Sequence, residues 1–325
     1  MKQFLHSLQR KCLFTVVILL TLHSLSFSQS APGPYYEAGV TVGPMVFMGD
    51  LGGHFGRGAN AFLKDYNFPT TKLSVGAFLG YHPSEWLGFR LALNYGNVAG
   101  DDALIQNKGG EEIFRKNRNL DFRSVIMEGM VGIEIYPTVL LEQESSELGG
   151  RLRPYGMIGL GVFHFNPQGT YVDPNTGQST WVDLQPLHTE GEGFAEYPGR
   201  KNYKLTQLNI PMAVGIKYYF SQNVNLAFEL LYRKTFTDYI DDVSTTFIDP
   251  SLFYKYLSPS QAIIANAIYN KSPLRNTPGS NFQVTDKRGD PTHTDAYFTL
   301  GFKLAIRLGQ NSEWNNSTRC PLLRF

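Results

Sequence analysis

The chain has 325 residues with a formal net charge of +1, and 14% of its residues are aromatic. This balance offers no strongly basic surface, so we expect no nucleic-acid partner. Abundant glycine beside abundant tyrosine and phenylalanine suits strands that have one apolar face and one small or polar face.

The first residues have the composition of a secretory signal peptide. Lys2, Arg10 and Lys11 form a basic start, residues 13–25 form an apolar run, and cleavage is expected after Ser28. An uncleaved membrane anchor is the competing interpretation, but the run is short for a span of roughly 20 residues and no stop-transfer pattern follows. Residues 1–28 are therefore predicted to be removed, and losing three cations and no acids lowers the net charge to about −2.

The two cysteines carry little information. Cys12 precedes the apolar run, which argues against a diacyl lipoprotein, and it leaves with the signal peptide. Cys320 then has no partner in the chain, so no internal disulfide is expected.

Eight segments of the mature chain read as β-strands. In residues 73–81, for example, leucine, valine, alanine and tyrosine at odd positions alternate with serine, glycine and phenylalanine. Most are long enough to cross a membrane at a tilt, which takes about 9–11 residues. Pro211 cannot donate to a ladder and is expected to mark a bulge. The predicted strands are 36–48, 73–81, 87–96, 122–136, 153–165, 208–219, 224–233 and 298–308.

The connections alternate in length. Residues 82–85 and 221–223 are tight turns and 137–152 is a moderate acidic link, whereas 49–71, 98–120, 166–202 and 239–293 are long. Short turns at one end and long loops at the other are typical of outer-membrane barrels, whose turns and termini are periplasmic. Within the last loop, residues 259–270 predict a short helix capped by Ser260.

The second face of the strands carries charge. A soluble lipocalin-like barrel also has eight alternating strands, but its apolar face points inward, where these charges would be out of place. We therefore predict an all-β, eight-stranded, antiparallel up-and-down transmembrane barrel over residues 29–309, with a periplasmic tail at 310–325. The predicted inward-facing charges are Arg90, Glu128, Glu134, Lys217, Glu229, Arg233, Lys303 and Arg307.

Five cations and three anions in so narrow a lumen predict a paired ionic plug. An eight-stranded barrel is just wide enough for side chains to fill it, and an unpaired buried charge costs several kcal/mol. A conducting pore is the alternative.

Enzymatic chemistry has weak support. A rim hydrolase would need a nucleophile beside a histidine, and the loose candidates are His164, His188, Asp241, Asp242 and Ser244. No Gly-x-Ser-x-Gly element is present and the histidines lack zinc-ligand spacing. Residues 173–178 hold oxygens suited to calcium, yet such clusters are usually simple turns. We expect no catalytic residue, no metal site, no cofactor and no small-molecule substrate.

Several stretches of the mature chain together resemble one family. The most specific stretches are PYGMIGLGVFHFNP (154–167), WVDLQPLHTEG (181–191) and YRKTFTDYIDDVSTT (232–246). YNFPTTKLSVGAF (66–78), NYGNVAGDD (94–102) and RNLDFRS (118–124) complete the set. Together they resemble the PorG-like outer-membrane barrels of the Bacteroidetes type IX secretion system, and the resemblance covers essentially the whole mature chain.

The resemblance implies a non-enzymatic accessory barrel that sits in outer-membrane lipid and contacts the system's periplasmic lipoprotein ring. The periplasmic surfaces expected to be available are the 137–152 link, the residues before the first strand, and the tail. The alternatives are a general outer-membrane barrel whose long loops bind a ligand or another protein, and a rim enzyme that acts on lipid or peptide.

Overall fold

The computed structural model describes residues 34–51, 68–105, 112–141, 152–221 and 223–308. The described residues all belong to one compact unit. The predicted signal peptide (1–28) and the predicted tail (310–325) lie outside the described residues. None of the helices within the described ranges has the length and apolarity to span a membrane.

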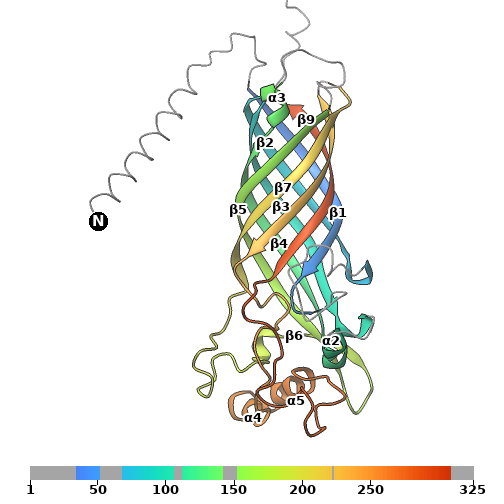
Figure 1. The fold of residues 1–325 in the computed structure, drawn as a ribbon, viewed down its shortest axis with the longest axis vertical. Helices are drawn as coiled ribbons and strands as arrows, with labels where there is room; N and C mark the ends of the chain where they lie inside the picture. The colour runs from blue at the N-terminus through green and yellow to red at the C-terminus, as the bar shows by residue number, and fades with distance from the viewer. Residues whose placement is uncertain (1–33, 52–67, 106–111, 142–151, 222, 309–325) are drawn as a thin grey trace, which may run out of the picture. The chain divides into compact units, whose positions relative to one another are not determined.

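Eight antiparallel strands close into a barrel (Figure 1). Each strand pairs with its neighbours along the chain, and β1 closes the ring by pairing with β9. The predicted fold is confirmed. The barrel strands are β1 (Tyr35–Met48), β2 (Lys72–Ser84), β3 (Leu87–Asp101), β4 (Asp121–Ile135), β5 (Leu152–Val172), β7 (Thr206–Tyr219), β8 (Val224–Thr235) and β9 (Ala296–Leu308).

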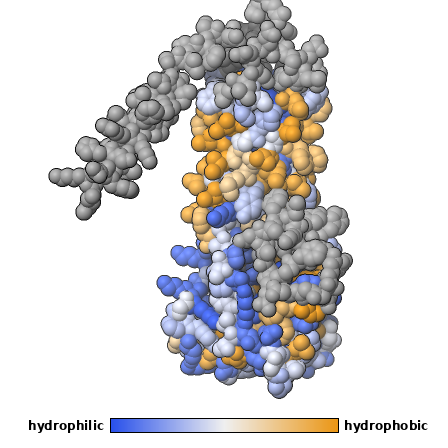
Figure 2. Space-filling view, in the orientation of Figure 1, coloured by the Kyte–Doolittle hydropathy of each residue, from blue (hydrophilic) through white to orange (hydrophobic). Residues whose placement is uncertain are grey.

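Alternation along the strands produces an apolar outer wall. On β3, Leu91 and Leu93 are more than half exposed, whereas Arg90 and Ala92, which alternate with them, are buried inside the barrel. A soluble protein would not leave this much apolar surface in water, but a lipid-facing wall requires it. On the face drawn in Figure 2, apolar side chains gather over the upper part of the barrel, and hydrophilic side chains are more frequent on the described surface nearer the cap.

In the part of the chain that the structure describes, one end of the barrel carries tight turns and a short helix, and we call it the turn end. The β2–β3 turn is shorter than predicted because β2 runs on to Ser84, with a register shift between Tyr81 and Ser84. His82 was predicted to lie in that turn but belongs to the strand. The link after β4 begins with α3 (Pro137–Leu141).

Pro211 does not mark a bulge, contrary to the prediction. The register of β7 against β5 and β8 is unchanged on either side of it. Only the ladder with β5 is interrupted there, since proline has no N–H to donate.

The opposite end is folded rather than open. β3 and β5 extend past the predicted strand ends, and β5 pairs with the added strand β6 (Ser179–Asp183). The helical elements are η2 (Phe68–Thr70), η3 (Asp102–Leu104), α2 (Glu112–Arg118), η4 (Gln185–Leu187), α4 (Ser251–Tyr256) and α5 (Pro259–Ile268). We call the described residues 102–105, 112–120, 173–205 and 236–295 the cap.

The cap has its own hydrophobic core. Phe247, Phe253 and Ile268 are buried in it together with residues of the β5–β7 loop. The predicted helix at 259–270 is confirmed as α5, but Ser258, not Ser260, is its N-cap residue, because Pro259 occupies the first helical position. A second core, which includes Phe122, Phe163 and Tyr297, fills the end of the barrel that adjoins the cap.

Candidate functional site

The charged lumen is the first candidate. Seven of the eight predicted inward charges are buried, and Arg307 is half-buried near the turn end, where its guanidinium lies 4.1 Å from the centre of the Tyr35 ring. The strand pleat places them inside because each occupies the face opposite the exposed apolar residues.

The middle of the lumen holds a four-charge cluster. Arg90 lies 2.8 Å from the Glu229 carboxylate and also pairs with Glu134. The Lys303 ammonium is 3.4 Å from Glu229 and 3.7 Å from Glu134. Tyr155 donates a 2.7 Å hydrogen bond to Glu229. Two cations and two carboxylates thus neutralise one another in a site shielded from water.

Nearer the cap, Glu128 is the centre of a second cluster. It accepts hydrogen bonds from Arg233 (3.1 Å), Asn209 (2.6 Å), Asn94 (2.9 Å) and Tyr297 (3.2 Å). These donors come from β8, β7, β3 and β9, so one carboxylate on β4 joins strands from around the ring.

A third cluster near the turn end contains two residues that the sequence interpretation missed. Lys217 donates to Glu37 at 2.9 Å, and His82 lies 3.5 Å from the same carboxylate. Arg153 is also buried on the inner face near the turn end, opposite Lys217, and pairs with Glu85 at 2.8 Å. With Glu37 and Arg153 included, the described part of the lumen holds four buried carboxylates and five buried Lys or Arg cations. Alternation along β1 would have revealed Glu37, since Tyr36 beside it is exposed.

The lumen has almost no free space at its middle. A void lined by Phe78, Arg90, Met130, Glu229 and neighbours has a volume of about 10 Å³. That is roughly the space for one water molecule.

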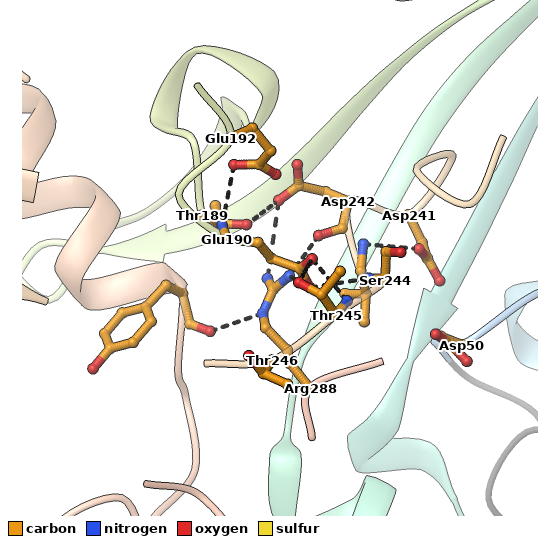
Figure 3. Close-up of polar contacts among 12 residues, drawn as sticks. Asp50, Thr189, Glu190, Glu192, Asp241, Asp242, Ser244, Thr245, Thr246 and Arg288 are labelled. Atoms are coloured by element: carbon orange, nitrogen blue, oxygen red, sulfur yellow. Dashed lines mark hydrogen bonds and ion pairs between the residues drawn. The ribbon is translucent and has the colours of Figure 1, made fainter. Parts of the chain in front are cut away.

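The second candidate is a buried polar network in the cap, shown in Figure 3. Arg288 is at its centre and donates to the Glu190 carboxylate at 2.9 Å, the Tyr269 carbonyl at 3.1 Å and the Asp242 carbonyl at 2.5 Å. Glu190 also accepts from the backbone N–H groups of Ser244 and Thr245. Segments as far apart in sequence as 190 and 288 are therefore joined by one ion pair.

Two acids of this network hold protons unusually tightly. Burial raises the pKa of Glu192 to about 8, with further raising by the nearby charges of Asp242 and Glu190. Burial also raises the pKa of Asp242 to about 6, although Arg288 and the hydroxyls of Thr189 and Tyr203 oppose the shift.

Four more acids gather where the cap meets the barrel rim. Burial and mutual repulsion raise the pKa of Asp241 and Asp295 well above the usual range, and burial raises that of Asp238 to about 9. Asp50 is the fourth acid of this group, and burial raises its pKa as well. Within the described ranges, no group of three or more His, Cys, Asp or Glu side chains is arranged to hold a metal ion.

The loose hydrolase candidates lie in two places, with His164 on the barrel wall and His188, Asp241, Asp242 and Ser244 in the cap. His164 lies exposed on the barrel wall beside Thr206, whereas His188 is half-buried in the cap. Asp241 accepts from the backbone N–H groups of Leu51 and Val243, which is a structural role. Among the described residues, no hydrogen bond joins either histidine to Asp241, Asp242 or Ser244.

The predicted oxygen-rich turn at 173–178 is the tip of the β5–β6 hairpin. Asp173 accepts from the Asn175 N–H and the Thr176 hydroxyl, and Gly177 adopts a φ of +68°. These bonds occupy the carboxylate as in an ordinary Asx turn.

Fold and lumen together define the class: a closed β-barrel with a lipid-facing wall and a side-chain-filled interior. The model of the family described as "Outer membrane protein beta-barrel domain" matches residues 13–255. The chain belongs to this family and is an integral outer-membrane protein. No curated protein matches the chain.

Among solved structures, the chain is similar to several outer-membrane proteins. For Ail, the attachment invasion locus protein of Yersinia pestis, in complex with the heparin analogue sucrose octasulfate, the TM-score is 0.33 at 8% identity, covering 84% of this chain and 99% of Ail. For a major outer membrane protein from Thermus thermophilus it is 0.36 at 11% identity, covering 85% and 100%. For OprG from Pseudomonas aeruginosa it is 0.30 at 13% identity, covering 85% and 96%.

Proposed function

We propose that this protein is a non-conducting, non-enzymatic outer-membrane barrel that serves as a structural or assembly component of the type IX secretion machinery. The observation that carries the non-conducting part is the filled lumen. Paired charges occupy the barrel from near the turn end to near the cap, and the void between them holds about 10 Å³. Transport through the barrel would require breaking buried ion pairs, which is costly.

The folded cap supports the same conclusion. Substrate channels need an entrance, whereas here the cap core and the apolar core below it are both packed. A function carried by the surface, through contacts with other proteins, fits this arrangement better than passage through the barrel or chemistry inside it.

The proposed orientation follows the usual asymmetry of such barrels. The cap, built on the long loops, faces the outside, and the turn end with both chain termini faces the periplasm. The partner surface is then the turn end, together with the 137–152 link and the 310–325 tail. The type IX assignment rests on the resemblance of the stretches at 154–167, 181–191 and 232–246, and its partner is the periplasmic lipoprotein ring.

A pull-down in mild detergent tests the assembly role. Full-length protein, tagged in an exposed cap turn, is expected to co-purify with type IX ring components, whereas recovery of none of them would contradict the role. Deletion of residues 311–325 is expected to weaken the recovery, and unchanged recovery would rule out the tail as the contact. The matched control is Lys255→Ala, which removes an exposed cap ion pair at the other end.

A further inference from the structure

A cleft of about 900 Å³ lies on the outer side of the barrel extension. Its walls come from the cap-side ends of β3, β4 and β5, from β6, and from the end of α5. This volume is within the range of small-molecule sites, which is about 300–1,000 Å³. We call it the headgroup cleft.

The headgroup cleft combines an aromatic ring with cations. Arg123 stacks on Trp181, with its guanidinium carbon 4.3 Å from the ring centre, and bonds to the neutral amide of Gln168 at 2.9 Å. Lys72 is exposed at the cleft wall. Within the described residues, neither Lys72 nor Arg123 forms an ion pair with a carboxylate.

The other charges of the headgroup cleft are already engaged. Lys271 forms an ion pair with Asp121, and Asp101 accepts from the backbone N–H of Ala103 at 2.8 Å. The cleft therefore presents two available cations, which favours an anionic ligand.

The headgroup cleft begins where the lipid-facing wall ends. Leu73 and Met127 are 63% and 54% exposed on that wall, and Lys72 and Arg123 follow them toward the cap on the same strands. Tyr95 on β3 lies between them and is also exposed. A ligand in the cleft would thus sit at the boundary between hydrocarbon and water.

The lipid-facing wall has a depression on the turn-end side of the headgroup cleft. This depression, which we call the wall hollow, has a volume of about 560 Å³. It is lined by Val75, Leu93, Tyr95 and Met127 and runs across β2, β3 and β4. Gly129 also lines the wall hollow and leaves it open, because a Cβ atom at this position would lie 3.5 Å from the Leu93 side chain. An apolar hollow that lies on the same strands as a cationic cleft matches a molecule with acyl chains and an anionic head.

We propose that the headgroup cleft and the wall hollow together bind a phosphorylated glycolipid. The phosphate pairs with Lys72 and Arg123, a sugar ring packs on Trp181 and Tyr171, and an acyl chain lies in the wall hollow. With the cap facing outward, as proposed above, this places the site in the leaflet where such glycolipids reside. The choice of leaflet rests on the orientation proposed above, whereas binding of the glycolipid requires neither that orientation nor the secretion role.

The test is binding of lipid A to the full mature chain purified in detergent, which does not depend on orientation in the cell. Lys72→Glu with Arg123→Glu is expected to weaken binding by at least about tenfold, as loss of two charge-assisted contacts predicts. Gly129→Leu, which fills the wall hollow from outside, and Trp181→Ala are each expected to weaken it severalfold. A heat-shift gel confirms that each variant remains a folded barrel.

Two controls separate this site from general attraction to lipid. Lys234 is also an exposed lysine and lies on β8, four strands from β3 in either direction, so Lys234→Glu is expected to leave binding unchanged. Dephosphorylated lipid A is expected to bind weakly, and phosphatidylglycerol, which has a phosphate but no sugar, less tightly than lipid A. Equal binding of phosphatidylglycerol and lipid A, or equal loss in Lys234→Glu and the double variant, would overturn the proposal.

Discussion

Glu128 illustrates how this barrel tolerates charge in its interior. Its carboxylate is desolvated, but four side chains donate to it, so its burial is compensated by charge-assisted hydrogen bonds. Arg233 is in turn held by Glu128 and by the Thr299 hydroxyl at 2.6 Å. Each partner is therefore costly to remove alone.

Replacing Glu128 by Ala is expected to destabilise the barrel by about 3–5 kcal/mol, because Arg233 is left as an uncompensated buried charge. Urea unfolding in lipid vesicles, followed by tryptophan fluorescence, measures the loss.

The matched control is Glu128→Ala combined with Arg233→Met, which removes both charges. This double variant is expected to be more stable than Glu128→Ala alone. A loss below about 1 kcal/mol for the single variant would mean that the pair is screened as at a surface.

At the scale of residues, the sequence predicted the lumen better than the cap. Strand alternation identified Arg90, Glu134 and Lys303 as inward-facing, because a period of two fixes the face of every residue once the strand is known. His82 was missed since Pro83 after it suggested a turn. The Arg288–Glu190 pair joins irregular loops, for which no periodicity exists.

At the scale of elements, the cap holds more acid than base in its interior. Glu192 and Asp242 are fully or almost fully buried close to Glu190, with Arg288 as the facing cation and Tyr203 as a hydroxyl donor. Because the pKa values of Glu192 and Asp242 are raised, the folded cap binds more protons than the unfolded chain between about pH 4 and pH 8.

The cap is therefore expected to lose stability as the pH rises. The two protonated carboxyls contribute fully to the stability of the cap below their unfolded pKa values, which are 3.8 for Asp242 and 4.5 for Glu192. This stabilisation is lost as the pH rises past about 6 for Asp242 and about 8 for Glu192. Hydrogen-exchange protection of residues 189–197 and 241–247, corrected for intrinsic rates, is expected to be lower at pH 8.5 than at pH 5.

Glu192→Gln keeps the shape without the titration and is expected to flatten the upper part of this dependence. Glu196→Gln, an exposed carboxylate in the same loop, serves as the control and is expected to leave it intact. A cap whose protection rises with pH in the parent chain would contradict this account.

The elements themselves were largely predictable from the sequence. The eight barrel strands and α5 were found because their patterns are periodic, whereas α2, α4 and β6 were missed because they are short and depend on the cap core. The strand extensions at 97–101 and 166–172 also escaped prediction. Most of their outward residues are polar, such as Asn97, Asp101 and Gln168, so the apolar alternation that predicts a strand ends before them.

At the scale of the whole molecule, charged side chains fill the lumen and apolar cores fill the cap end. Among the described residues, four buried carboxylates and five buried Lys or Arg cations line the lumen, and two apolar cores lie within the cap and between the cap and the lumen charges. This packing is the basis of the proposal that the barrel does not conduct and that its contribution to the outer membrane comes from its surfaces.

Single-channel recording in planar lipid bilayers tests this central claim most directly. Purified, heat-shift-verified protein inserted into the bilayer is expected to give a current that does not differ from the protein-free baseline at either polarity. Discrete, reproducible conductance steps from the intact chain would show an open lumen and contradict the account.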